Sequence, residues 1–322
     1  MHAIVAALCA ALAALFAFPS PALAQGWPAK PIRLIAPYPP GGQTDIVSRW
    51  IAEKVGPALG QPILVDNRSG AQGIVGLEAA KNAAADGYTF VYVNLSNIAV
   101  NPHVFAKLPY DGQRDFVAVT QVGLTGLAMV VPASLGARTL REFIAWAKAN
   151  PGKVNYASIG TGSTPHLYGE MLKDMAGIAM THVPYKGAGP IVPDLLGAQV
   201  HMSILDLAAI RAHVDAGRLV ALAMTGPRRW PGWDVPTFAE QGYAIDLAGW
   251  NGIMAPAGTP RAAVERMSAE IVKAVQSPEG REQVLKMGLI PTGTTPDAFA
   301  QAVREDTLRW GEVIRKANVK LD

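Results

Sequence analysis

Short apolar runs alternate with amphipathic stretches along almost all of the chain after its first 30 residues. Runs rich in β-branched and aromatic side chains are typical of buried strands. They occupy residues 31–38, 62–68, 88–95, 116–123, 128–132, 154–160, 181–187, 200–207 and 219–226. Apolar positions spaced three and four apart predict helices over residues 44–59, 139–150, 260–277, 280–288 and 296–319. This alternation indicates an α/β protein with mostly parallel sheets flanked by helices.

One arrangement, a strand followed by a glycine-rich loop and a helix, occurs twice. It covers residues 31–50 and again residues 154–176. Two such units predict two α/β lobes that face each other across a cleft. The chain is expected to leave the first lobe near Leu124–Leu127 and to return to it through an apolar run at 247–260. These positions give the expected bounds of the lobes, which are 25–124 with 246–322 for lobe 1 and 125–245 for lobe 2.

The amino terminus predicts a secretory signal peptide. Residues 1–24 hold no Lys, Arg, Asp or Glu, and a short apolar core precedes an Ala22-x-Ala24 pair. That core is too short for a stable membrane span. The single cysteine, Cys9, lies inside this segment, so the mature chain has no disulfide, thiol nucleophile or Cys metal ligand. We expect an exported protein that is cleaved after about Ala24.

Charge and motifs exclude several classes of function. The net charge is +3, and Lys and Arg are not clustered, which argues against nucleic-acid binding and against a membrane-surface patch. The mature chain holds no second apolar stretch long enough to span a bilayer. The sequence contains no H-E-x-x-H metal-binding motif, and neither glycine-rich loop carries a dinucleotide or P-loop fingerprint. We therefore expect no metal and no cofactor.

The first glycine-rich loop, "PYPPGGQTD", lies just before a predicted helix. A helix start leaves about four backbone N–H groups unpaired and carries roughly half a positive charge. Gly41 and Gly42 have no side chains, so a ligand oxygen can approach that backbone closely. Thr44 or Asp45 is expected to cap the helix.

The second loop, "SIGTGSTPH", occupies the equivalent place in the second unit. Thr164 is expected at the N-cap, with Pro165 at the first helical position. Ser158, Thr161 and Ser163 add hydroxyls that donate or accept hydrogen bonds. Each loop alone is better explained as an ordinary turn and cap than as a binding site. Together, in equivalent positions on opposite lobes, they make binding an equal reading, and a carboxylate is the ligand that suits them.

Polar residues at strand ends supply further candidates. Asp206 ends the run 200–207, where open α/β sheets present ligand residues, and it either receives a ligand hydroxyl or ammonium group or caps the next helix. Ser96 and Asn97 follow the strand at 88–95 and face the same crevice. His166 is interpreted either as a pocket residue or as a structural histidine. Trp250 is expected to pack in the core or hinge rather than to stack on a ligand.

A third glycine-rich tract, with Gly70, Gly73 and Gly76 spaced three apart, favours close packing of a helix on a sheet over ligand binding. The rival class of function is a secreted, hydrolase-like enzyme that uses Ser163, His166 and Asp206. Proline at position 165 breaks the G-x-S-x-G pattern of a nucleophile elbow, so plain binding is favoured.

Several segments together resemble one protein family across essentially the whole mature chain. They are "WPAKPIRLIAPYPPGGQTDIVSRWIAEKV", "VDNRSGAQGIVGLEAAKNAAADGYTF", "ANPGKVNYASIGTGSTPHL", "HVPYKGAGPIVPDLLGAQVHM", and "DVPTFAEQGY" with "WNGIMAPAGTP". The sequence resembles the Bug family, the extracytoplasmic substrate-binding proteins of tripartite tricarboxylate transporters. The resemblance implies a two-lobed periplasmic-binding-protein (type II) fold, a periplasmic location and a small organic carboxylate as ligand.

The resemblance also implies which residues hold the ligand. Family members bind a carboxylate between the two loops, often through ordered waters. Carried onto this sequence, this points to Tyr38, Gly42, Gln43, Thr44, Asp45, Ser158, Thr161, Ser163 and Thr164. The family's first loop usually has a third glycine where this chain has Gln43, which changes the side chain available to the ligand.

The implied mechanism is hinge closure of the lobes around the acid, followed by docking on membrane components of the transporter. No catalytic chemistry is required, and we expect a monomer. A sensor that presents the closed form to a signalling partner remains an equal reading of the same surface.

Overall fold

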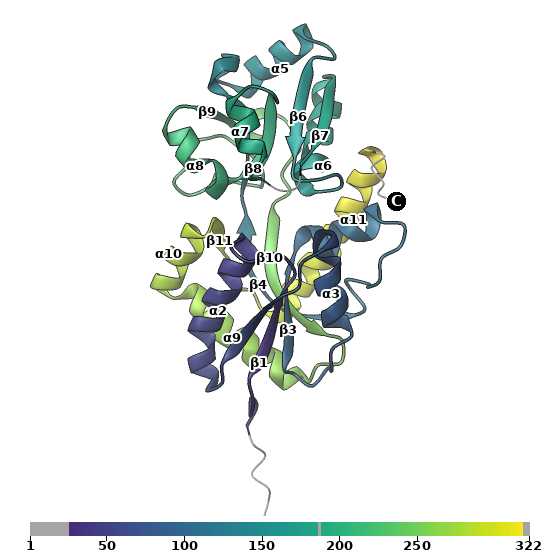
Figure 1. Ribbon diagram of the computed structural model, residues 1–322, viewed down its shortest axis with the longest axis vertical. Helices are drawn as coiled ribbons and strands as arrows, with labels where there is room; N and C mark the ends of the chain where they lie inside the picture. The colour runs from purple at the N-terminus through teal and green to yellow at the C-terminus, as the bar shows by residue number, and fades with distance from the viewer. Residues whose placement is uncertain (1–25, 186–187, 318–322) are drawn as a thin grey trace, which may run out of the picture.

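The computed structural model describes residues 26–185 and 188–317 and divides them between two sheets, one in each half of the molecule (Figure 1). The predicted signal peptide, residues 1–24, lies outside the described residues. The α/β class and the two-lobed arrangement are confirmed.

The first sheet has six strands in the order β11-β4-β10-β3-β1-β2. Their bounds are β1 Ile32–Ala36, β2 Ile63–Asn67, β3 Thr89–Asn94, β4 Phe116–Thr125, β10 Gly249–Pro256 and β11 Leu289–Pro291. Helices α2 (Gln43–Leu59), α9 (Arg261–Gln276) and α10 (Pro278–Lys286) bury their apolar stripes on one face. Helices α3 (Ile74–Lys81) and α11 (Pro296–Ala317) cover the other.

The second sheet has five strands in the order β7-β6-β8-β5-β9. Their bounds are β5 Leu127–Pro132, β6 Val154–Ser158, β7 Met180–Pro184, β8 Met202–Asp206 and β9 Leu219–Met224. Helices α5 (Leu140–Ala149) and α6 (Thr164–Ala176) pack on one face. Helices α7 (Ile191–Leu196) and α8 (Leu207–Asp215) pack on the other.

Each sheet is mixed rather than mostly parallel. Among the described strands, four pairings are parallel and five are antiparallel. The antiparallel pairings all involve β4, β5 or β10, the strands that carry the chain between the sheets. Strands β5 and β10 each enter their sheet from the other lobe and run antiparallel to the strands beside them, and β11 pairs antiparallel with β4. Only Gly126 separates β4 from β5, so the lobes are joined by nearly continuous strands.

Local signals explain where helices begin. Helix α5 starts at Thr139, whose hydroxyl accepts from the backbone N–H of Glu142 while Glu142 bonds back, a complete capping box. The predicted caps of the two loop helices are wrong. The N-cap residue of α2 is Gly42 and that of α6 is Ser163, one residue before the predicted Thr164, and neither side chain caps its helix.

A shared core links the two halves of the molecule. One hydrophobic cluster includes Val93 of β3 and Leu95 just after it, together with Met129 and Leu167 in the second half. Helix α11 extends from the first half to lie beside α6 (Figure 1), where Trp310 meets Tyr168 edge to face at 5.4 Å between ring centroids. The lobes are thus braced on one side, and a cleft between them opens elsewhere.

Two further expectations about packing are confirmed. A Cβ added at Gly76 in α3 would lie 2.6 Å from Cβ of Pro37, so this glycine permits close helix–sheet contact. Trp250 in β10 is 2% exposed and meets Phe299 edge to face at 5.1 Å. Within the described part of the chain, no helix is both long and apolar enough to cross a membrane.

Candidate functional site

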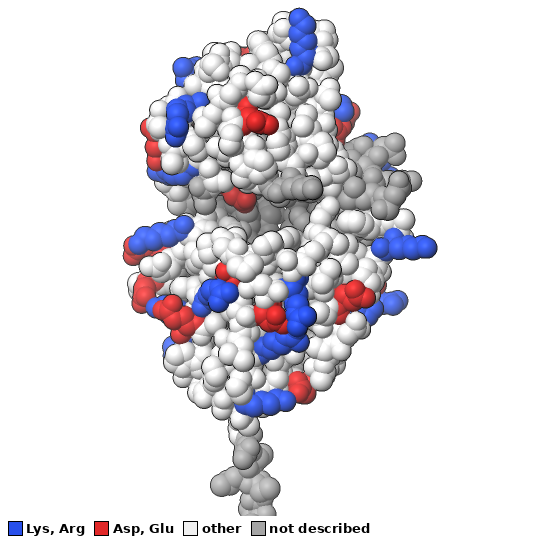
Figure 2. All heavy atoms as spheres, viewed as in Figure 1, with Lys and Arg blue, Asp and Glu red and all other residues white. Residues whose placement is uncertain are grey.

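A cavity of about 130 Å³ lies between the two sheets. Figure 2 shows the molecule hollowed at this level. The first lobe contributes mainly amide and hydroxyl side chains, and the second contributes apolar side chains, the Thr164 hydroxyl and one carboxylate. The lining residues are Gln43, Asn94, Leu95, Ser96, Thr125, Leu127, Ile159, Thr164, Pro165, Ile204, Leu205, Asp206, Gly249, Trp250 and Asn251. Its volume is below the roughly 300–1,000 Å³ of common ligand pockets, which suits a small ligand.

The starts of α2 and α6 lie at the two sides of this cavity. In Figure 1 the chain rises along β1 toward the second half and turns back into α2, while α6 begins at the lower edge of the second half. Gln43, the first residue of α2, and Thr164, the first of α6, both line the cavity. Two helix amino termini therefore direct their backbone N–H groups and positive dipole ends toward one space.

In the first loop, the Asp45 carboxylate already accepts hydrogen bonds from other groups of the protein. Its carboxylate accepts from the Gly41 backbone N–H at 3.0 Å, from Asn67 at 3.0 Å and from Arg49 at 3.1 Å. The hydrogen bond from Arg49 is the main cause that lowers the pKa of Asp45. Gln43 is held beside the cavity, because its amide donates to the Met287 carbonyl at 3.1 Å.

Hydrogen bonds of one tyrosine and two asparagine side chains fix the strand end next to this loop. The Tyr38 hydroxyl donates to the Gln72 carbonyl and accepts from the Asn94 amide, each at 3.2 Å. Asn94 and Asn97 exchange two side chain to backbone hydrogen bonds at 3.0 Å. Asn97 is fully buried and does not line the cavity, whereas its neighbour Ser96 does.

The second loop is held by hydroxyls that bond within it. Ser158 is buried and its hydroxyl lies 2.9 Å from the Gly160 carbonyl and 2.7 Å from Nε2 of His182. Ser163 donates to the same Gly160 carbonyl at 2.6 Å. The carbonyl of Thr161 accepts from the Gln72 amide at 3.4 Å, which connects this loop to the first half of the molecule.

His166 also acts within the second loop. Its Nδ1 accepts a hydrogen bond from the backbone N–H of Gly162 at 3.0 Å, and the side chain is buried. Burial lowers the pKa of this imidazole, with Lys173 adding to the effect and Glu170 opposing it. Since Nδ1 accepts, the ring is neutral in this arrangement.

The three residues of the rival hydrolase hypothesis do not form a hydrogen-bonded set among the described residues. Ser163 bonds to Gly160 and His166 bonds to Gly162, and no hydrogen bond among the described residues connects either with Asp206. A nucleophile needs a base within about 3 Å. His166 therefore does not activate Ser163 in this geometry.

Of the thirteen predicted site residues, four line the cavity directly, namely Gln43, Ser96, Thr164 and Asp206. The other nine lie in the loops and strand ends that surround it, namely Tyr38, Gly42, Thr44, Asp45, Asn97, Ser158, Thr161, Ser163 and His166. Sequence reasoning missed the polar lining residues Asn94, Thr125 and Asn251. Asn94 ends the strand before Ser96, a local signal that could have identified it.

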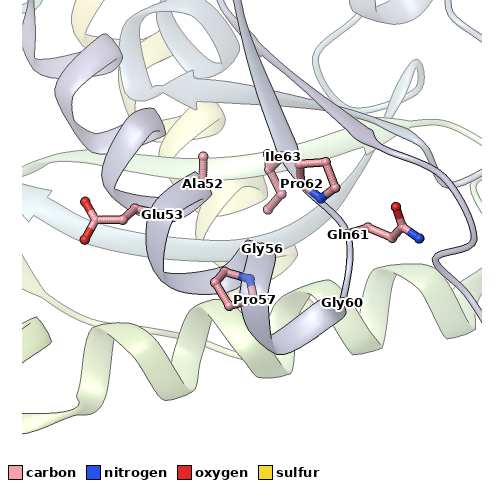
Figure 3. A pocket seen from close by; sticks show the side chains of 8 residues that line it. All are labelled: Ala52, Glu53, Gly56, Pro57, Gly60, Gln61, Pro62 and Ile63. Atoms are coloured by element: carbon pink, nitrogen blue, oxygen red, sulfur yellow. The ribbon is translucent and has the colours of Figure 1, made fainter.

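A second hollow, about 640 Å³, lies at the far end of α2 (Figure 3). It is lined by Ala52, Glu53, Gly56, Pro57, Gly60, Gln61, Pro62 and Ile63. In Figure 3 the Glu53 and Gln61 side chains lie on opposite sides of it and do not converge. We assign no ligand to this hollow. Within the described residues, no group of three or more His, Cys, Asp or Glu is arranged to hold a metal ion.

The model of the family described as "Tripartite tricarboxylate transporter family receptor" matches residues 47–319. The chain belongs to this family. A similar relative, protein BugT of Bordetella pertussis, is 37% identical to this receptor over 305 residues, which cover 94% of each chain. The predicted Bug-family membership is thereby confirmed.

Solved structures of similar proteins agree with this assignment. Rpa4515 of R. palustris with adipate is 32% identical, with a TM-score of 0.84, and the match covers 91% of this receptor and 99% of that chain. MatC of Rhodopseudomonas palustris with bound malate is 28% identical, with a TM-score of 0.78, over 89% and 100% of the two chains. Both ligands are dicarboxylic acids.

Proposed function

We propose that this receptor is a periplasmic solute-binding protein that captures one small organic carboxylate in the cavity between its lobes. The carrying observation is that two helix amino termini without side-chain caps, those of α2 and α6, meet at one cavity. Each such terminus favours an anion by about 0.3–1 kcal/mol, and by up to ~2 kcal/mol where partly buried. The adipate and malate held by the two similar structures support an acid as ligand.

The ligand acts by closing the lobes rather than by undergoing a reaction. The interlobe bond between Gln72 and Thr161 joins the second loop to the Gly70–Gly76 tract of the first lobe, a contact of the kind that closure would strengthen. We propose that the closed form, as a monomer, docks on the membrane components of a tripartite tricarboxylate transporter. Family membership and the predicted signal peptide support transport as the purpose of binding.

Thermal unfolding of ligand-free protein against a panel of acids tests this proposal. The panel comprises dicarboxylates, tricarboxylates, hydroxy acids, amino acids and aromatic acids. An acid at 100 times its Kd stabilises the protein by about 2.7 kcal/mol, which raises Tm by roughly 5 °C in a chain of this size. A rise limited to a few related acids, with no turnover of those acids by mass spectrometry, is expected. No rise with any acid, or turnover of one, contradicts the proposal.

A further inference from the structure

Among the described residues that line the cavity, one is charged, and that residue is acidic. Asp206 ends β8 and lines the cavity from the second lobe, and none of the described lining residues is Lys or Arg. A cavity that receives an acid thus has a carboxylate on one side. A receptor that bound only the carboxylate groups of its ligand would gain nothing from this negative charge.

The Asp206 carboxylate is not engaged in holding the fold. It occupies the N-cap position of α8, yet no side-chain hydrogen bond caps that helix. No salt bridge within the described residues includes it. Asp45, at the other side of the cleft, differs because Arg49 and Asn67 satisfy its oxygens. Asp206 is therefore the acid left available to something inside the cavity.

The surroundings of Asp206 make its charge costly. Burial raises the pKa of the Asp206 carboxyl to about 6, against a smaller lowering by its own backbone N–H. The buried hydroxyl of Tyr92, across the cleft in β3, has no hydrogen-bond partner among the described residues. Burial and then the charges of Tyr38 and Asp206 raise the pKa of Tyr92. A ligand group that donates a hydrogen bond to Asp206 would offset the cost of burying its charge.

We propose that Asp206 forms a specificity subsite that receives a hydrogen-bond donor, a hydroxyl or ammonium group, carried by the acid that binds in the cavity. This inference rests on the proposed function, because the two loops must hold a carboxylate for the donor to reach Asp206. The preferred ligand is then a hydroxy or amino acid. An unsubstituted dicarboxylate of the same length leaves Asp206 without a partner, and a second carboxylate near it is repelled.

Calorimetric titration of ligand-free protein with matched acids tests the subsite. One series is succinate, malate and aspartate, and another is glutarate, 2-hydroxyglutarate and glutamate. Within at least one series, the acid with a hydroxyl or ammonium group is expected to bind about tenfold or more tightly than its unsubstituted partner, the value of one hydrogen bond to a charged group. Comparing the malate and aspartate arms shows whether the donor is a hydroxyl or an ammonium group.

The variant Asp206→Asn is expected to reduce this preference to about threefold or less, because the amide is a weaker acceptor. It should remain folded, since nothing in the described structure depends on the carboxylate. Asp306→Asn is the matched control. Asp306 is another carboxyl whose pKa burial raises, but it does not itself line the cavity, and its bond from Nε1 of the lining residue Trp250 can also be accepted by the amide oxygen of the variant. The control should keep the wild-type preference.

The pH dependence supplies an independent readout. Raising pH from 5 to 7 ionises Asp206 and is expected to increase the preference for the donor-bearing acid in wild type, but not in Asp206→Asn. Equal affinity within every series, or a preference that survives Asp206→Asn, overturns the subsite while leaving the proposed function intact. No binding of any acid contradicts the proposed function itself and, with it, the subsite.

Discussion

The imidazole rings of His166 and His182 stack with their centroids 3.8 Å apart and their planes within 18°. Tyr156 lies beside His182, with ring centroids 5.0 Å apart. His166 accepts from the Gly162 backbone and His182 bonds to the Ser158 hydroxyl. The stacked pair thus holds the second loop through these two hydrogen bonds, which gives His166 a structural role that the sequence could not separate from a pocket role.

We predict that this pair makes stability depend on pH. Burial lowers the pKa of His182 to about 4; His166 and Lys173 add to this, and Glu170 opposes it. The unfolded chain, with a His pKa near 6.5, binds more protons, so the contribution is complete above pH 6.5. It is lost as pH falls from about 6.5 to about 4, by about 2 kcal/mol. Urea unfolding at several pH values measures this.

His182→Phe is the matched variant, because it keeps a stacked ring and removes the titration. Its stability should change less than that of wild type between pH 6.5 and 4. Asp206 acts in the opposite direction, since its raised pKa favours folding at low pH, so the difference between the two proteins isolates His182. A wild-type and variant pH profile of the same slope would refute the assignment.

The two glycines of the first loop should respond differently to substitution. Gly42 has φ −81°, and an added Cβ would meet only the Pro39 carbonyl at 3.8 Å. Gly42→Val should therefore stay folded while covering the start of α2, and acid affinity should fall about tenfold. Gly41 has φ +84°, so Gly41→Val should cost roughly 1–2 kcal/mol of stability. Thermal unfolding and calorimetry separate the effects; unchanged affinity in Gly42→Val argues against anion binding there.

Much of the fold is readable from local sequence. The helix over 139–150 combines 3.6-residue periodicity with the Thr139–Glu142 capping pair, and it forms as α5. The two loop helices also form, but their caps fall at Gly42 and Ser163, because helix ends depend on backbone geometry that several neighbouring residues can satisfy.

The lining of the cavity depends on pairings far apart in sequence, which local patterns do not report. Asn251 lies opposite Asn94 in the β10–β3 ladder, and its amide bonds to Thr125 of β4. The three residues come together because β10 pairs with both β3 and β4, and Asn251 is 126 positions away from Thr125 in the sequence. Asp45 shows the reverse case, since its type and place suited a ligand, while Asn67 in β2 and Arg49 satisfy its oxygens.

Trp250 should contribute to stability through its ring nitrogen as well as through packing. Its Nε1 donates to the Asp306 carboxylate at 2.8 Å, and burial already raises the pKa of Asp306. Trp250→Phe leaves that carboxylate without this donor, so we expect a loss of about 1–3 kcal/mol in urea unfolding. Adding Asp306→Leu should recover part of it, because both polar partners are then removed. A double variant that is additive would show that the bond contributes nothing.

Gly126, the single residue between β4 and β5, should not tolerate a side chain. A Cβ added there would overlap the indole ring of Trp230, which is buried and bonded to the Thr225 carbonyl. Gly126→Ala is therefore expected to cost about 1–3 kcal/mol and, because the residue joins the lobes, to weaken acid binding as well. Trp230→Leu in the same chain should restore affinity by making room. Gly189→Ala, where among the described residues no atom beyond the two chain neighbours lies within 4 Å of the added Cβ, should change neither property. If Gly126→Ala had the same Tm and acid affinity as Gly189→Ala, the close contact with Trp230 would not constrain the connection between β4 and β5.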